Sequence, residues 1–149
     1  MSQICTIVTE VKDLADVAEA CKALGWRFVP DGGLLRSYKS QQGQRCTVLV
    51  EFPDRVVNRE GNPLNQKYNI GVVPRDYGTG YVLVHDNAMM GHEAPASDTM
   101  DHETAMLLGK FKQAIAVAAV VRQARRKRHQ VQKMLMADGT VRLDILVRR

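Results

Sequence analysis

The clearest signals of the fold lie in residues 101–149, DHETAMLLGKFKQAIAVAAVVRQARRKRHQVQKMLMADGTVRLDILVRR. Its first half predicts a long helix. Ser97, Asp98 and Asp101 are candidate N-caps, and acidic side chains there oppose the positive end of the helix dipole. Every residue from 114 to 121 is apolar, which predicts a segment buried on most sides. The segment is far too short to span a bilayer, because a spanning helix needs about 20 residues. The apolar positions at helical spacing are Leu107 or Leu108, Phe111, Ala114, Ile115, Ala118, Val121 and Ala124.

The second half of the stretch predicts a β-hairpin. Asp138-Gly139 is a preferred two-residue turn, because both turn positions need a positive φ. A two-residue loop pairs Met136 with Val141, Met134 with Leu143 and Lys133 with Asp144. That register places Val141, Leu143 and Ile145 on one face with Met134 and Met136, and a slip by one residue would remove that face.

The remaining chain predicts an α+β fold, with two helices packed on a mainly antiparallel sheet. Residues 4–11 alternate as a strand, Asp13 caps a helix, and Gly25 ends it in a left-handed conformation. Further strands are predicted near residues 26–29, 34–40, 45–52, 68–72 and 81–85, and residues 53–66 are predicted to form a surface loop. The expected order is β-α-β-β-β-β-β-α-β-β in a single domain over residues 1–149.

Size and composition agree with a single domain that has a proper core. The chain has 149 residues, of which 45% are hydrophobic and 25% charged, as is usual for a globular domain. Residues 1–10 lack the basic start and long apolar segment of a signal peptide, which predicts a cytoplasmic protein. The sequence has three cysteines, Cys5, Cys21 and Cys46, and no C-x-x-C pair. We therefore expect buried structural thiols rather than disulfides or a zinc ribbon.

Positive charge is concentrated at the end of the long helix. Residues 122–133 hold six Lys or Arg and no acid, namely Arg122, Arg125, Arg126, Lys127, Arg128 and Lys133. Such a patch can bind nucleic acid. The simpler interpretation, which we favour, is solvated charge that complements the helix C-terminus, and no aromatic residue is interleaved for base stacking.

No residue pattern predicts catalysis. The loops around the second helix start hold His85, Asp86, His92, Glu93, Asp101 and His102, and mixed histidine and carboxylate side chains can bind zinc or iron. Their spacing matches no defined ligand motif, so His85, His92 and His102 are weak metal candidates and no cofactor is predicted. None of the serines lies in a G-x-S-x-G elbow, and no phosphate-binding loop is present.

Several motifs occur in an order that resembles a known family. They are residues 4–9 (ICTIVT), Leu24-Gly25, residues 68–71 (YNIG), residues 81–84 (YVLV), Ala124-Arg125-Arg126 and residues 137–143 (ADGTVRL). On these motifs the chain resembles the domain-of-unknown-function 1257 family, which includes the hypothetical plastid reading frame 35 proteins. It departs from that family where aromatics are usual, at Asn87-Ala88, Ile115 and Val117. It also continues as Lys127-Arg128-His129 where the family commonly has a glycine.

The resemblance implies context but no activity. Genes of the family, in bacteria and some phages, often lie near those for MoxR-type AAA+ ATPases and von Willebrand A-domain proteins. We therefore expect a non-enzymatic accessory or adaptor that binds another protein, with a MoxR-type AAA+ ATPase system as the named candidate. The alternative is a nucleic-acid-binding protein that uses the basic end of the long helix, and the third is a metal-dependent enzyme at the histidine loops. The oligomeric state is left open.

Overall fold

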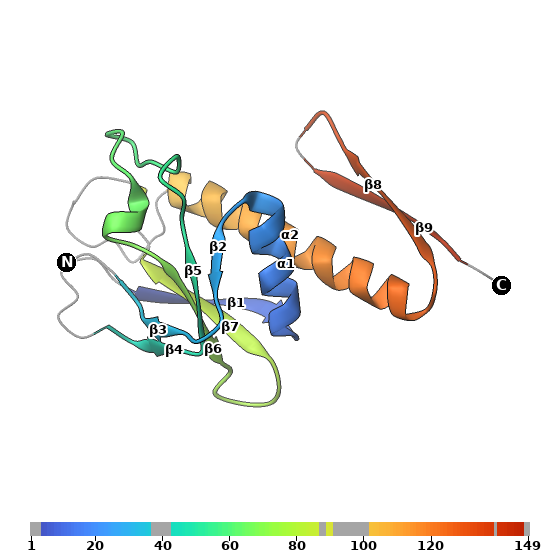
Figure 1. Cartoon of the computed structure of the whole chain (residues 1–149), viewed down its shortest axis with the longest axis horizontal. Coiled ribbons are helices and arrows are strands. Elements are labelled where there is room, and N and C mark those ends of the chain that lie inside the picture. Colours follow the sequence, from blue (N-terminus) through green and yellow to red (C-terminus); the bar gives the residue numbers. More distant parts are fainter. Residues whose placement is uncertain (1–3, 37–42, 87–88, 91–101, 139, 148–149) are drawn as a thin grey trace.

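A computed structural model describes residues 4–36, 43–86, 89–90, 102–138 and 140–147. The fold is α+β, as predicted, with two helices and mainly antiparallel sheets (Figure 1). The elements are β1 (Ile4–Val11), α1 (Leu14–Leu24), β2 (Arg27–Val29), β3 (Gly33–Leu34), β4 (Arg45–Cys46), β5 (Val48–Glu51), the 3-10 helix η1 (Leu64–Gln66), β6 (Ile70–Pro74), β7 (Tyr81–Asp86), α2 (His102–Arg126), β8 (Gln130–Leu135) and β9 (Val141–Leu146).

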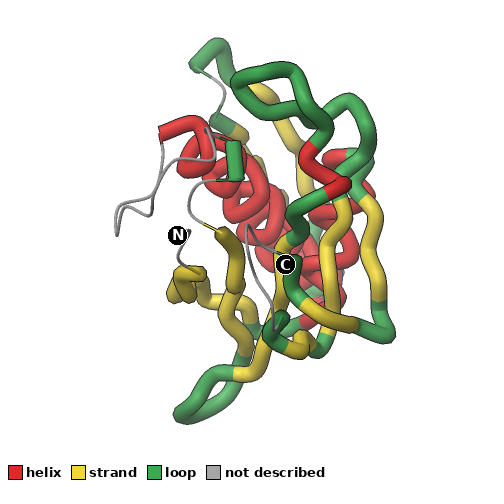
Figure 2. The backbone as a smooth tube through the Cα atoms, turned by 90° about the vertical axis from the view of Figure 1, so that its left-hand side faces the viewer, coloured by secondary structure: helices red, strands yellow, loops and turns green. Residues whose placement is uncertain are grey.

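Five strands form the main sheet, in the order β1-β7-β6-β5-β2, with every neighbouring pair antiparallel. Both helices pack on one face of this sheet, and the strands and helices form separate layers in Figure 2. The core between the layers joins Val50 and Ile70 of the sheet to Val17 of α1 and Phe111 of α2. Trp26 closes it, with its ring 5.3 Å from Phe111 and 5.0 Å from Phe52.

The opposite face of the sheet is covered by a small hairpin made of β3 and β4. We predicted one strand near residues 45–52, and that was wrong, because this segment forms two strands, β4 and β5. The chain bends at Thr47, so Cys46 packs with Leu49 on the covered face while Val48 faces the helices. A Cβ on Gly71 would lie 2.3 Å from the Cys46 sulfur. The absence of a side chain at Gly71 therefore lets the β3–β4 hairpin pack closely on the main sheet.

Helix α1 begins and ends as its capping residues predict. The Asp13 side chain accepts a hydrogen bond from the Ala15 amide at 2.9 Å. Gly25 has φ +71° and closes the helix through hydrogen bonds to the Cys21 and Lys22 carbonyls. The predicted surface loop, in contrast, reaches into the core: Leu64 of η1 is only 1% exposed. The predicted N-caps of α2 (Ser97, Asp98 and Asp101) lie outside the described residues.

Helix α2 has two environments along its 25 residues. Its first half buries Leu108, Phe111 and Ile115 against the sheet and α1. The second half extends beyond the sheet (Figure 1). The prediction that residues 114–121 are buried on most sides was wrong, because only Ile115 and Val121 are buried there, and Val120 is 37% exposed.

By length and composition alone, α2 could cross a membrane. An 18-residue window has a mean hydropathy of 1.4, and 28% of that window is buried. The apolar core helix of a globular domain passes the same test. The first half packs against the sheet and α1, whereas most apolar residues of the second half are partly buried or exposed.

The final hairpin forms, but its register differs from our prediction by one residue. Leu135 pairs with Val141, and the Met136 amide donates to the Thr140 carbonyl at 2.8 Å. Three residues rather than two therefore join the strands. The Asp138 carboxylate accepts hydrogen bonds from the amide and hydroxyl of Thr140, which stabilise this longer turn and hold the pKa of Asp138 below its usual value.

The changed register exchanges the faces of the hairpin. Lys133 now lies opposite Leu143, and not opposite Asp144. Val141, Leu143 and Ile145 do share a face, but with Val131 and Leu135 instead of the two methionines. Met134 and Met136 are on the other face and are 51% and 38% exposed.

Candidate functional site

A large groove lies between α1, the second half of α2 and the final hairpin. It encloses about 1290 Å³. No other element of the described chain covers this half of α2, and the hairpin forms its own two-stranded sheet away from the main one (Figure 1). We call this surface the α2 groove. Its apolar floor consists of Ala114, Val117, Ala118, Val121, Leu135 and Val141.

Arg122 ties the two helical walls of the groove together. Its guanidinium donates to both carboxylate oxygens of Asp16, at 2.8 and 2.9 Å, and lies 3.4 Å from the Asp13 carboxylate. The Asp16 side chain is only 3% exposed. A bidentate arginine–carboxylate pair fixes geometry as well as charge. This pair therefore sets the spacing between α1 and the second half of α2.

The six basic residues that the sequence singles out divide into three groups. Arg122 is held in its ion pair with Asp16. Arg125, Arg126 and Lys133 lie along the rim of the groove. The rim also includes Lys22 and Lys110. The other two, Lys127 and Arg128, are exposed where α2 ends and do not line the groove.

The end of α2 has an unusual backbone feature. Arg128 has φ +59°, a left-handed conformation that glycine adopts at little cost. The His129 amide donates to the Ala124 carbonyl at 2.9 Å and the Arg128 amide to the Arg125 carbonyl at 3.0 Å, so this residue ends the helix and redirects the chain into β8.

The three metal candidates are not brought together by the described residues. His85 is fully buried in β7, His102 is exposed at the first turn of α2, and His92 lies outside the described residues. Within the described part of the chain, no group of three or more His, Cys, Asp or Glu could hold a metal ion.

His85 is instead a core residue. Burial lowers the pKa of its imidazole below the usual value, an effect that Asp86 opposes and Lys112 strengthens. Neither ring nitrogen has a hydrogen-bond partner among the described residues. Neutral imidazole is therefore the form that this site favours.

Two of the three cysteines are buried thiols, as predicted. Cys21 packs between α1 and the sheet, and burial raises its pKa to about 12. Burial also raises the pKa of Cys46. Thiols in such surroundings are poor nucleophiles, because the reactive thiolate is disfavoured. The side chain of Cys5 lies outside the described residues.

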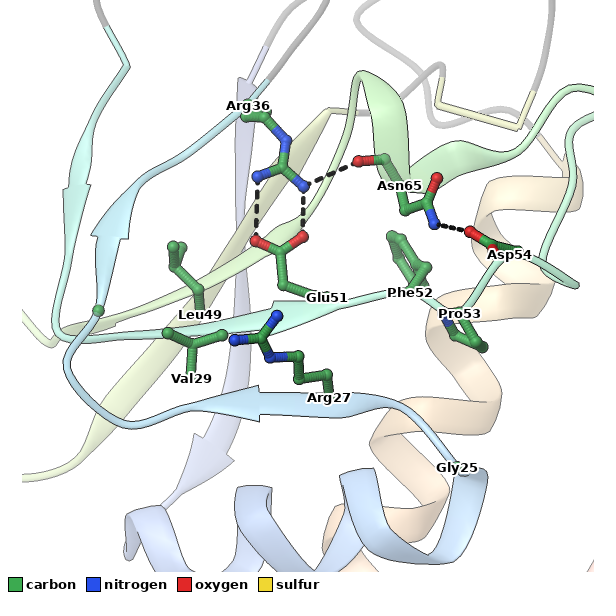
Figure 3. A pocket seen from close by; sticks show the side chains of 11 residues that line it. Gly25, Arg27, Val29, Arg36, Leu49, Glu51, Phe52, Pro53, Asp54 and Asn65 are labelled. Carbon is green, nitrogen blue, oxygen red and sulfur yellow. Dashed lines mark hydrogen bonds and ion pairs between the residues drawn. The ribbon is translucent and has the colours of Figure 1, made fainter.

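A second pocket, of about 750 Å³, lies at the β2–β5 end of the sheet (Figure 3). Arg36 forms a two-pronged ion pair with Glu51 and donates to the Asn65 carbonyl at 3.0 Å. The Asn69 side chain is part of the same network, because it accepts from the Arg36 amide at 2.7 Å and donates to the Leu34 carbonyl at 3.3 Å. These polar groups hold the β3 connection against β5 and η1, which is a structural role.

Sequence reasoning missed both the groove and this network. The groove had a usable signal: residues 114–121 are apolar on all sides of a helix, and such a helix needs partners all round. The described chain supplies partners on one side only. The network had no local signal, because Arg36 and Asn69 are separated by 33 residues.

Comparisons with known proteins identify no relative. No protein-family model matches the chain, and neither does any curated protein or any solved structure. The resemblance drawn from the sequence motifs therefore stays a prediction.

Proposed function

We propose that this chain is a non-enzymatic adaptor that binds another protein through the α2 groove. The observation that carries the proposal is the open apolar floor of the groove, in a helix whose other half is well buried. An apolar centre with a polar rim is typical of protein-binding sites. Following the family resemblance, the candidate partner is a MoxR-type AAA+ ATPase system.

The exposure of apolar residues on the groove floor supports a binding role for this face in particular. Val117 and Leu135 lie on the floor, and Leu135 is 76% exposed. Removing apolar side chains of this kind from water is the dominant favourable contribution in most protein–protein association. An isolated two-stranded hairpin is itself only marginally stable. A partner that covers the groove would stabilise the hairpin as well.

The test uses a photo-crosslinking amino acid in place of Ala118, which lies on the groove floor. Crosslinked proteins are identified by mass spectrometry, purified and titrated against the unmodified chain. We expect a saturable complex that the V117Q/L135Q variant binds at least about tenfold more weakly.

The matched control is V120Q/M134Q. Val120 is on the same helix and Met134 on the same hairpin, both are exposed, and neither lines the groove. This control should bind as the unmodified chain does. A partner that binds all three proteins equally, or no saturable partner at all, would remove the proposal.

Nucleic-acid binding is the second candidate, favoured by the exposure of Arg125, Arg126 and Arg128 at the end of α2. If phosphate contacts drive it, the affinity for DNA or RNA falls steeply with salt, by about one power of the salt concentration for each phosphate contacted. Labelled DNA and RNA at low and moderate salt, with the Arg125/Arg126/Arg128 triple glutamine variant as control, decide this. A flat salt response, or equal binding by the variant, excludes it.

A further inference from the structure

The rim of the α2 groove is strongly basic. Six Lys or Arg side chains line the groove against only two acids, Asp16 and Glu19. Asp16 is already neutralised by Arg122, so the rim attracts negative charge. The five basic side chains outside that ion pair come from all three walls: Lys22 from α1, Lys110, Arg125 and Arg126 from α2, and Lys133 from β8.

The floor between these charges is apolar and, in part, very small. Ala114 and Ala118 face the groove one helical turn apart, with Val117 and Val121 beside them. Small side chains allow a second helix to approach closely. A groove of about 1290 Å³ holds roughly three turns of a helix that is about 10 Å across.

Shape and charge together select one occupant. We propose that the α2 groove binds an acidic amphipathic helix of a partner protein, with the apolar face of that helix on the floor and its carboxylates against the basic rim. This inference rests on the proposed protein-binding function and specifies the chemistry of the partner. Helices that lie in apolar grooves are recognised through residues at i, i+3 or i+4, and i+7.

Other occupants fit the groove less well. None of the residues that line it is aromatic, so nucleic-acid bases would have no side chain to stack on. A lipid bilayer is flat, whereas this surface is concave between two helices and a hairpin. A second copy of the chain would bring its own basic rim against this one, and opposed like charges disfavour such a pair.

The experiment uses designed peptides in fluorescence anisotropy. The test peptide has 18 residues, with Leu at i, i+3, i+4 and i+7 spacing on one face and Glu on both flanks. One control has Lys for every Glu, and another has the same composition with the Leu residues dispersed around the helix. We expect saturable binding of the acidic amphipathic peptide, with both controls weaker by at least about tenfold.

Two arginine-to-glutamine variants assign that binding to the rim. R125Q/R126Q removes two charges beside the groove, and R45Q/R75Q removes two from exposed arginines that do not line it. Both have the same net charge. R125Q/R126Q should lower the affinity for the acidic peptide about tenfold and make that affinity less dependent on salt. R45Q/R75Q should leave the affinity within about twofold of that of the unmodified chain. Circular dichroism checks that both variants retain the fold.

Several outcomes would overturn the inference. Equal or tighter binding of the Lys peptide would do so, as would equal binding by the dispersed control. Tighter binding to a DNA duplex or to anionic phosphatidylserine vesicles, lost in R125Q/R126Q, would assign the rim to that ligand. A dimer in sedimentation that V117Q abolishes would assign the groove to a second copy.

The proposed function has a separate outcome. A crosslinked partner that V117Q/L135Q loses but R125Q/R126Q still binds in full would keep protein binding and reject the acidic helix. The acidic-helix inference can therefore fail while the proposed protein binding stands.

Discussion

Both halves of α2 carry apolar side chains, but their surroundings differ. In the first half, Phe111 is fully buried among Trp26 and the sheet, while in the second half Val120 is 37% exposed. The more exposed half is the more apolar one, because every residue from 114 to 121 is apolar. An apolar helix therefore predicts that other surfaces cover it. Its sequence does not show whether those surfaces belong to the same chain.

The largest expected effect is a loss of stability in the buried half. Replacing Phe111 with Ala leaves a cavity beside Trp26 and should lower the free energy of unfolding by about 3–5 kcal/mol. The same change at Val120 should cost less than about 1 kcal/mol, because that side chain already contacts water. Urea denaturation measures both. Equal losses at the two positions would show that the halves do not differ as described.

The second effect concerns the link between the halves and α1. R122Q leaves the Asp16 carboxylate, which is 3% exposed, without its cation, and should lower the melting temperature more than D16N does. Both losses should be smaller than that of Phe111→Ala. The two single variants and the double form a thermodynamic cycle. Additive losses would mean that the pair contributes no coupling.

The third effect is a pH dependence in the buried layer. The folded pKa of His85 is below its unfolded value of about 6.5. Between these two values the unfolded chain binds more protons, so acidification destabilises the fold. We expect a loss of at most about 1.4 kcal/mol for each pH unit below 6.5. Unfolding free energies of the unmodified chain and H85L at pH 7.5 and 5.5 test this, and parallel losses would contradict it.

The fourth effect concerns the backbone conformation at the end of α2. Arg128 has a left-handed backbone conformation, so R128G should stabilise the protein by about 0.5–1 kcal/mol. Lys127, its neighbour, has no such conformation, and K127G should destabilise instead. Thermal denaturation compares the two, and destabilisation by both glycines would count against a strained Arg128.

The smallest effect on stability is expected in the groove itself. Leu135 is 76% exposed, so L135Q should change the free energy of unfolding by less than about 0.5 kcal/mol. Its effect should instead be on partner binding. A large loss of stability would mean that the groove is part of the core.

Local patterns predicted the local features of this fold. Asp13 and Gly25 marked the ends of α1, because each satisfies the backbone groups of its own helix. The Asp138-Gly139 turn located the final hairpin. Its register was off by one, because the side chain of Asp138 holds Thr140 and lengthens the turn to three residues. A turn dipeptide predicts that a hairpin exists, and the loop length sets which residues pair.

Features made by distant residues could not be predicted in the same way. Because the chain bends at Thr47, β4 and β5 belong to different sheets. The alternating pattern of residues 45–52 gives no sign of this bend. The pairing of Arg122 with Asp16 spans 106 residues. Arg122 therefore looked like one more member of a basic patch, although the fold gives it a structural partner.

The separation of the final hairpin from the main sheet has a consequence for how this protein can diversify. Among the described strands, β8 and β9 pair only with each other. Substitutions in the hairpin therefore leave the pairing of the other strands unchanged. A lineage could alter Leu135 or Lys133 to follow a changing partner while the rest of the fold stays constant. The same separation makes the hairpin a suitable place to graft a new specificity by design.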